Sequence, residues 1–338
     1  MEIKVIGIDL AKNVFQLHGV DQQGHVVLQK RLSRRKLSEF MAQLPPCLVG
    51  MEACGGAHYW ARKFASFGHD VKLMNPCYVK PYVKTNKNDF NDAEAICEAV
   101  ARPSMRFVAI KSIEQQDIQM LHRIRSRLVQ ERTALINQMR GLLLEYGIII
   151  PQGISQIRKN FLEVLDIYEH ALTPRSKLLF GDLYEQLKEM DNKIRHYDKS
   201  IQQLCQESEV CQRLTQVQGI GPLTATALVA AVGDAKLFKS GRQMAAWLGL
   251  VPRQCSSGGK QILLGISKRG DRYLRSLLIH GARAVVKQAK HKLDDMSCWI
   301  RGLKERRGYN KACVAVANKN ARILWALMAH GACYQSNQ

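Results

Sequence analysis

The sequence predicts an α/β domain at the N-terminus, followed by two mostly helical regions. Apolar runs of strand length alternate with segments of helical periodicity over residues 1–110. Long helical patterns without strands occupy residues 111–207, and shorter helices separated by glycine-containing turns occupy residues 208–338. A chain of 338 residues corresponds to about two average domains, and its 46% apolar content is ample for their cores.

The first domain is predicted to open with three consecutive strands. They are expected at 3–9, 13–20 and 25–31, with the residues from Asp21 to Gly24 as the turn of a hairpin. Helices and strands then alternate, as a helix at 33–43, a strand at 47–52, a helix at 57–67, a strand at 70–74 and a helix at 88–101. Three antiparallel strands followed by alternating helices and strands is the order of a ribonuclease H-like α/β domain.

Two long amphipathic helices are predicted next, at 112–146 and at about 175–206, the first closed by Gly147 and Pro151. The apolar stripe of the first comprises Leu121, Ile124, Leu128, Leu135, Met139 and Leu142. The stripe of the second comprises Leu183, Leu187, Met190, Ile194, Tyr197, Ile201 and Leu204. These alternating spacings of four and three predict a coiled coil that pairs two subunits, and a helix packed on its own domain is the alternative.

The third region begins with a short glycine turn. Gly219-Ile-Gly221 followed by Pro222 resembles a helix-hairpin-helix turn, whose backbone N–H groups hold a phosphate, although a tight turn between packed helices explains it equally well. The segment SGRQMAAWLGLVPR and a Gly/Ser loop follow. Helices are then expected at about 271–290 and 310–332.

The charge balance predicts a polyanionic partner. The chain carries 50 Lys+Arg against 29 Asp+Glu, a formal net charge of +21. No apolar stretch is long enough to span a bilayer, and Met1 leads directly into a strand, so we expect neither a membrane partner nor a signal peptide. The ten cysteines are scattered singly without a CxxC pair, so we expect neither zinc nor disulfides.

Four acidic residues predict a metal site. Asp9 and Glu52 each end an apolar strand, and Asp89 and Asp92 lie three apart at the start of a predicted helix. Carboxylates gathered in this way repel one another unless a cation lies among them. Oxygen ligands without Cys or His favour Mg²⁺, with Mn²⁺ as a second choice, as in two-metal phosphodiester sites. The alternative is structural, because Asp89 and Asp92 also suit a helix N-terminus.

A basic, glycine-containing segment at 251–275 predicts a phosphate-binding surface. It holds one acid, Asp271, and six cations, Arg253, Lys260, Lys268, Arg269, Arg272 and Arg275. Ser256 and Ser257 in the same segment are candidate nucleophiles or ordinary loop polar residues. A second basic run, QKRLSRRK, includes Arg34, Arg35 and Lys36 and is a candidate contact to a nucleic-acid backbone, or a solvated helix start.

Taken together, these motifs resemble one family along nearly the whole chain. GIDLAK, MEACGG, KNDFNDAEAI, VQGIGPLTATAL, AAWLGLVPRQ and SSGGKQILLGISKRGDRYLRSLLIHGARA are similar to insertion-sequence transposases related to the Piv DNA invertases, the bridge-RNA-guided recombinases. The resemblance implies a RuvC-like domain with Asp9, Glu52, Asp89 and Asp92 as its DEDD acids. It also implies a coiled-coil linker and a C-terminal transposase domain with a catalytic serine, which we assign to Ser257 with Ser256 as the neighbouring alternative.

The resemblance also implies partners and a reaction. A noncoding bridge RNA pairs with donor and target double-stranded DNA, and a phosphoserine intermediate forms at Ser257. Strand exchange at two duplexes requires four cuts, which predicts a dimer that becomes a tetramer on synapsed DNA. A bacterial cytoplasmic enzyme associated with the nucleoid is expected. The rival interpretations are a metal-dependent nuclease of the Holliday-junction-resolvase type and a non-catalytic nucleic-acid-binding protein.

Overall fold

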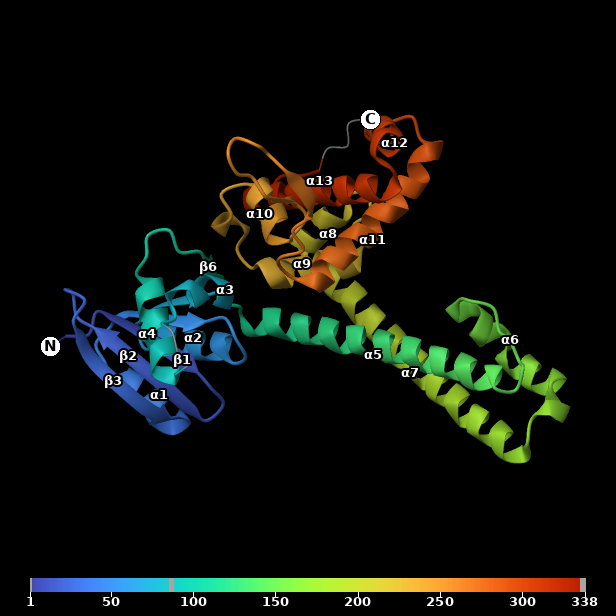
Figure 1. Cartoon of the computed structure of the whole chain (residues 1–338), viewed down its shortest axis with the longest axis horizontal. Coiled ribbons are helices and arrows are strands. Elements are labelled where there is room, and N and C mark those ends of the chain that lie inside the picture. Colours follow the sequence, from blue (N-terminus) through green and yellow to red (C-terminus); the bar gives the residue numbers. More distant parts are fainter. Residues whose placement is uncertain (1, 85–87, 335–338) are drawn as a thin grey trace. The chain divides into compact units, whose positions relative to one another are not determined.

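The computed structural model describes residues 2–84 and 88–334, so that Lys87, the first residue of the KNDFNDAEAI motif, lies outside the described part. The chain divides into two compact units, residues 1–114 and 115–338 (Figure 1). The finer division at residue 207 stays a prediction. No helix within the described ranges is both long and apolar enough to cross a membrane.

The first unit is built on a six-stranded mixed sheet in the order β3-β2-β1-β4-β5-β6. The strands are β1 Val5–Leu10, β2 Val14–Val20, β3 Val26–Ser33, β4 Leu48–Glu52, β5 Asp70–Met74 and β6 Phe107–Val108. β1, β4 and β5 run parallel, and the other neighbouring pairs are antiparallel. Five strands were predicted. The sixth, β6, was missed because its two residues are too few to show a periodic pattern of apolar and polar side chains.

Hydrogen bonds confirm the predicted hairpin turn between β2 and β3. The Asp21 carboxylate accepts from the backbone N–H groups of Gln23 and His25, both at 2.9 Å. Gly24 has a φ of 87°, a conformation that glycine adopts without a steric penalty. The mixed α/β architecture of this unit agrees with the sequence prediction.

Helices cover both faces of this sheet. The unit contains α1 Arg34–Gln43, α2 Ala57–Ser66, α3 Pro76–Val79, a 3₁₀ turn at Lys80–Tyr82 and α4 Asp89–Val100. Side chains of β1 alternate, so Ile6 and Ile8 pack in one core with residues of α1 and α2. Val5 packs on the second core, which contains Ile96 of α4. α4 therefore lies on the opposite face from α1 and α2.

The second unit begins with a pair of long antiparallel helices, α5 Ile113–Leu144 and α7 Pro174–Glu207. Arg125 forms an ion pair with Asp198 at 2.5 Å, and Arg132 forms one with Asp191 at 3.1 Å. The residue later in α5 therefore pairs with the residue earlier in α7, as expected for antiparallel helices. The apolar stripe of α7 is buried or half-buried within the chain. Intramolecular packing therefore occupies the predicted seam, and subunit pairing through it stays a prediction.

The predicted stripe of α5 is wrong at two positions. Ile124 and Leu142 are 39% and 42% exposed, whereas Ile136 and Leu143 are buried. A further helix, α6 Ile154–Ile167, was not predicted, and it packs through Ile157 and Phe161 on the ends of the pair. Both α6 and α7 therefore cover the apolar face of α5, so its buried residues do not follow the heptad pattern expected for a contact with one helix.

The remainder of the second unit is a helical core. It contains α8 Glu209–Thr215, α9 Pro222–Val232, α10 Gly241–Trp247, α11 Arg272–Gln288, α12 Asp295–Arg307 and α13 Tyr309–His330, with 3₁₀ turns at Ala235–Leu237 and Ala289–His291. A further 3₁₀ turn, Glu169–Ala171, lies between α6 and α7. α11 and α13 lie where helices were predicted, and α8, α10 and α12 were missed. One continuous core of residues from α8 to α13 holds these helices together.

The glycine turn between α8 and α9 packs tightly on α11. A Cβ atom on Gly281 would lie 1.8 Å from the carbonyl oxygen of Gly219, which itself has a φ of 84°. This contact supports the interpretation as a tight turn between packed helices for Gly219. Gly221 faces open space, and phosphate binding there stays a prediction.

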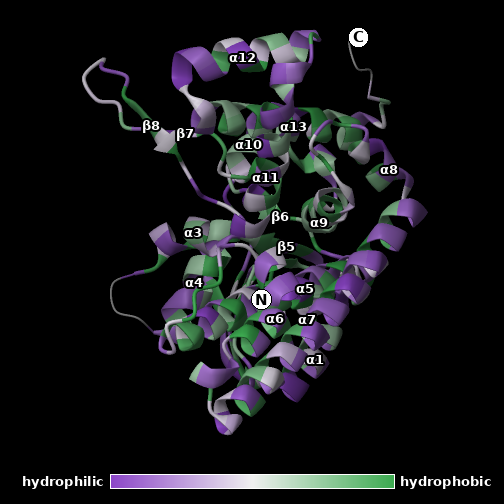
Figure 2. Ribbon diagram, turned by 90° about the vertical axis from the view of Figure 1, so that its right-hand side faces the viewer, coloured by the Kyte–Doolittle hydropathy of each residue, from purple (hydrophilic) through white to green (hydrophobic). Residues whose placement is uncertain are grey.

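The segment predicted as a Gly/Ser loop forms a two-stranded antiparallel ribbon, β7 Pro252–Gln254 and β8 Leu263–Ile266. Figure 2 shows this ribbon protruding from the helices of its unit. Apart from the half-buried Ile266, the residues of its strands are exposed, so no buried face produced an alternating pattern that would reveal the strands.

Candidate functional site

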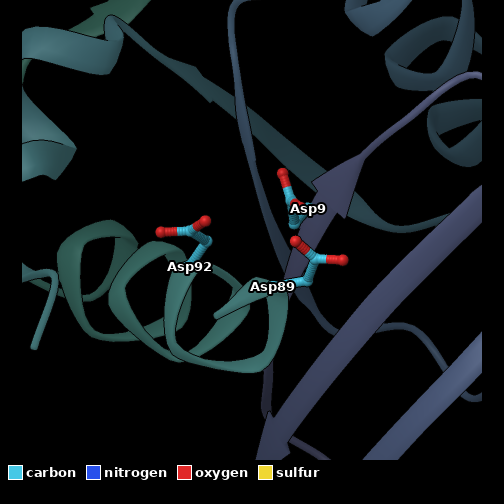
Figure 3. Close-up of side chains that lie close together, drawn as sticks. All are labelled: Asp9, Asp89 and Asp92. Carbon is cyan, nitrogen blue, oxygen red and sulfur yellow. The ribbon is translucent and has the colours of Figure 1, made fainter. Parts of the chain in front are cut away.

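Three of the four predicted acids meet at one end of the first unit. Asp9 lies in β1, and Asp89 and Asp92 lie in the first turn of α4 (Figure 3). One carboxylate oxygen from each of the three lies within 4.8 Å of the other two. Asp9 and Asp92 are half-buried and Asp89 is exposed. Only carboxylate oxygens are offered, which fits Mg²⁺ or Mn²⁺.

Strand alternation and a glycine bring these acids together. Gly7 lies two residues before Asp9, on the same face of β1, and a Cβ atom there would lie 2.3 Å from the carbonyl oxygen of Ala93 in α4. The missing side chain lets α4 approach the strand closely. The first turn of α4 is therefore held beside the end of β1, where its two aspartates face Asp9.

Glu52 lies beside this cluster but outside the three-acid group. Ile8 pairs with Met51 in parallel register, so Asp9 and Glu52 follow at the ends of neighbouring strands. Burial, and after it the negative charges of Asp9 and Asp92, raise the pKa of Glu52 above its ordinary value. Glu52 thus belongs electrostatically to the site that the other three acids form.

Helix capping does not explain Asp89 and Asp92. The N-cap of α4 is Asn88, whose side-chain oxygen accepts from the backbone N–H of Phe90 at 3.1 Å. The capping alternative is therefore wrong for the two aspartates, although both still gain from the helix dipole. Gathering four mutually repelling acids costs free energy that a bound cation would recover.

The two candidate serines lie at the tip of the β7–β8 ribbon. Ser257 and Lys260 form a bridge across a turn in which Gly258 and Gly259 have φ angles of 55° and 79°. Two consecutive residues with positive φ are typical of a tight two-residue hairpin, and glycine fits both positions. Ser256 accepts a hydrogen bond from the side-chain amide of Gln254 at 2.9 Å, and both serines are exposed.

The cations of this segment differ in their environments. Arg253, Lys260, Lys268, Arg269 and Arg272 are exposed. Arg275 is half-buried, and its guanidinium donates to the carbonyl oxygen of Leu248 at 3.3 Å. The sequence between Asp234 and Asp271 has many cations and no acid. The ribbon therefore presents only positive charge beside the serines.

A buried polar network behind this segment was missed by sequence reasoning. His122 of α5 contacts the hydroxyl groups of Tyr273 and Thr226, both at 3.0 Å. Burial, and after it the Arg125 guanidinium, lower the pKa of His122 to about 4. A single histidine in a long helix carried no sequence signal, because its partners lie more than 100 positions away.

Comparison with known proteins gives two family matches. A model described as a transposase, for the DEDD domain of IS110 elements, matches residues 6–148, and one described as "Transposase IS116/IS110/IS902 family" matches residues 211–296. A probable family 20 transposase of Pseudomonas aeruginosa is 53% identical over 99% of both chains. The chain belongs to the IS110/IS116/IS902 transposase family. It is therefore an enzyme that cleaves and rejoins DNA.

Two further relatives are another insertion-sequence transposase and a more distant gene-inverting protein. The transposase for insertion sequence element IS1111A of Coxiella burnetii is 49% identical over 99% of this chain and 92% of the relative. The Pilin gene-inverting protein of Moraxella bovis is 26% identical over 81% of this chain and 80% of its own length. The resemblance to transposases and to the Piv invertases is thereby confirmed. The four acids lie in the first matched segment of the transposase, and both serines lie in the second.

Proposed function

We propose that this transposase is an RNA-guided DNA recombinase that joins strands through a phosphoserine intermediate. In this proposal the element encodes a noncoding bridge RNA, which pairs with donor and target DNA, and base pairing reads the sequence. The protein holds the backbones through its cations. It acts in the bacterial cytoplasm, on the nucleoid.

The observation that carries the proposal is the position of Ser257. An exposed hydroxyl at the tip of a narrow ribbon can reach a phosphodiester that a concave site would exclude. The positive charges of the cations that flank it are complementary to the negative charge of the scissile phosphate. A nuclease that used the acids alone would have no need of this ribbon.

Ser257 is the proposed nucleophile. Its Oγ forms a bond to phosphorus as the bond from phosphorus to the leaving sugar oxygen breaks. The serine proton passes to solvent and the leaving oxygen takes up a proton, so the step is balanced. Attack by a sugar hydroxyl of the exchanged strand on the phosphoserine then releases the serine and rejoins the DNA.

The four acids are proposed to hold the metal in a RuvC/ribonuclease H-like domain. Asp9, Asp89 and Asp92 supply the clustered oxygens, and Glu52 lies beside them. When bound, Mg²⁺ stabilises negative charge on phosphate oxygens. Arg253, Lys268 and Arg272 are proposed to flank the phosphate that Ser257 attacks. Contacts to nucleic-acid backbones are proposed for Lys260, Arg269, Arg275, Arg34, Arg35 and Lys36.

The proposed organisation follows the three regions of the sequence. Residues 1–110 form the RuvC-like domain, 111–207 the helical region that pairs subunits as a coiled coil, and 208–338 the transposase domain. Four cuts at two duplexes require four serines, so the active form on synapsed DNA is proposed to be a dimer of dimers.

A covalent-adduct assay tests the proposal. The protein, RNA transcribed from the flank of the element, Mg²⁺ and labelled donor and target duplexes are incubated and resolved on denaturing gels before and after protease treatment. Wild type is compared with Ser257→Ala and Ser256→Ala. We expect a protease-sensitive adduct that only Ser257→Ala abolishes.

Other outcomes would support the rivals. Free nicks that neither serine substitution affects would indicate a metal-dependent nuclease of the Holliday-junction-resolvase type. Nucleic-acid binding without any cleavage, unchanged by Asp9→Ala, would indicate a non-catalytic binding protein.

A further inference from the structure

An exposed aromatic side chain of the first unit lies beside two cations. Tyr59, in α2, is 44% exposed, and its ring meets the buried Trp60 ring edge-on at 5.2 Å between centroids. The Arg34 guanidinium lies 5.5 Å from the centroid of the Tyr59 ring, and the Lys63 ammonium lies 6.0 Å from it. Both cations also lie within 5.7 Å of the centroid of the Trp60 ring.

The surroundings of this cluster are strongly positive. Residues 26–51 contain Glu39 as their one acid, and residues 53–69 contain none. Glu39 pairs with Arg35 at 3.0 Å. Among the ion pairs of the described residues, none includes Arg34 or Lys63. Their positive charges are stabilised by the aromatic rings and remain available to an anion.

We infer that Tyr59, Arg34 and Lys63 form a binding site for an unpaired nucleotide of a single strand. The base stacks on the exposed Tyr59 ring or on the Arg34 guanidinium plane, and the adjoining phosphates lie against the two cations. A duplex keeps its bases stacked inside, so it would engage the cations but not the ring. The aromatic ring therefore makes this surface selective for single strands.

The rigidity of the cluster supports this inference. Trp60 is 2% exposed and packs against Phe15 and Phe64 of the core, with ring centroids 5.2 and 5.3 Å away. A ring anchored on a core side chain loses little conformational entropy when a base stacks on it. The inference rests on the proposed function in one respect, namely that the reaction supplies an unpaired strand.

Fluorescence anisotropy tests the inference with three labelled probes of one length. They are a mixed-sequence RNA strand without self-pairing, the DNA strand of the same sequence, and the corresponding DNA duplex. Since stacking on one aromatic side chain contributes about 1–3 kcal/mol, Tyr59→Ala is expected to weaken single-strand binding at least fivefold. Duplex binding should change less than twofold, and Tyr59→Phe should retain wild-type affinity for all three probes. Comparison of the RNA and DNA strands shows which source of unpaired nucleotide the site prefers.

A charge-matched control separates the effect of the aromatic cluster from the general electrostatic attraction between arginine side chains and phosphates. Arg34→Ala should weaken single-strand binding more than Arg35→Ala, because Arg35 contacts no ring in the described residues and is paired with Glu39. Circular dichroism melting of each variant verifies that the unit remains folded. An equal loss for strands and duplex in Tyr59→Ala, or no loss at all, would overturn the inference.

The probes contain no guide sequence, so this result is separable from that of the adduct assay. RNA-dependent adduct formation together with unchanged single-strand binding by Tyr59→Ala would reject the Tyr59 site and leave the proposed function standing. Tyr59-dependent strand binding without any RNA-dependent adduct would support the Tyr59 site and reject the proposed function.

Discussion

The Nδ1 atom of His122 and the hydroxyl oxygen of Tyr273 lie 3.0 Å apart, although 151 positions separate them in the sequence. His122 belongs to the long helix α5, and Tyr273 follows Arg272 at the start of α11, near the end of the basic segment 251–275. The second imidazole nitrogen contacts Thr226, whose hydroxyl donates to the carbonyl oxygen of Pro222 at 2.8 Å. One neutral imidazole therefore ties the helical pair to the base of the serine-bearing segment.

This contact predicts an acid-sensitive stability. Burial lowers the pKa of His122 from 6.5 to about 4 in the folded chain. Below pH 6.5 the unfolded chain therefore binds a proton that the folded chain does not, and stability falls as the pH decreases towards 4. The loss at pH 5 is expected to be about 2 kcal/mol.

Urea denaturation at pH 7.5 and pH 5 measures this loss. His122→Gln keeps hydrogen-bonding groups but cannot titrate, so its stability deficit relative to wild type should shrink by about 2 kcal/mol at pH 5. Tyr273→Phe serves as a control that removes one partner and retains the imidazole. A deficit that stays constant between the two pH values would contradict the assignment of a neutral, buried His122.

The acid cluster predicts that Asp92→Asn raises the thermal stability of the metal-free protein and removes most of the stabilisation by bound metal. Removing one negative charge relieves repulsion with Asp9 and Asp89, so the metal-free variant should melt at a higher temperature than wild type. Mg²⁺ at about ten times its dissociation constant should stabilise wild type by about 1.4 kcal/mol and the variant by almost nothing. DNA cleavage should be lost, with RNA and DNA affinity nearly unchanged because the basic surfaces are intact.

Differential scanning fluorimetry with and without MgCl₂ or MnCl₂ gives the comparison. Asp70→Asn makes the same charge change in the same unit at a residue that pairs with Lys72 and lies outside the cluster. It should respond to metal as wild type does. Collapse of RNA affinity in Asp92→Asn would instead show that this acid has a structural role.

The contact of Gly7 with α4 predicts that a methyl group at this position damages the site. The Cβ atom of Gly7→Ala would lie 2.3 Å from Ala93 O and 2.4 Å from Cys97 N, so α4 must move away from β1. A displacement of about 1 Å at a catalytic site reduces rates by about 100-fold. The variant should therefore lose both cleavage and the stabilisation by Mg²⁺.

Gly55→Ala is the matched control in the same unit, because a Cβ atom there meets nothing within 4 Å. Cleavage rates and metal-induced melting shifts are measured for both variants. If Gly7→Ala kept the wild-type metal response, the approach of α4 would not be what assembles the acids.

At Lys268, the backbone conformation favours glycine, whereas the proposed contact with DNA requires the charged side chain. Apart from glycine, Lys268 is the one described residue with a positive φ, 53°. A side chain in this region costs about 1–2 kcal/mol, which the N–H bond to the Gly249 carbonyl at 3.2 Å helps to offset. Lys268→Gly should therefore be more stable than Lys268→Ala by about 1 kcal/mol.

Both Lys268 variants lose the same charge, so both should lose the same affinity for duplex DNA. Chemical denaturation gives the stability difference, and anisotropy with a labelled duplex gives the affinity. Equal stability of the two variants would argue against strain at this position. Unequal DNA affinity would show that the backbone conformation, and not only the ammonium, contributes to binding.

Most elements of the first unit were predictable because their signals are local. The strands ending near Asp9 and Glu52 are apolar runs of strand length, and the turn at Asp21–Gly24 has its own side-chain hydrogen bonds. Two of the elements that were missed, α10 and α12, lack such signals. α10 has seven residues, too few for a readable period, and α12 buries only Ser297 and Ile300 among its charged residues.

The sequence by itself determined the mixed α/β class, the positive charge, the four acids and the serine segment, because composition and periodicity depend on neighbouring residues. Only the tertiary structure decided which acids meet, since that depends on β1 lying beside β4 and on α4 approaching Gly7. It likewise decided the partners of His122 and the clustering of Arg34 and Lys63 around Tyr59. These contacts join residues far apart in the chain, and the packing that creates them is a property of the whole fold.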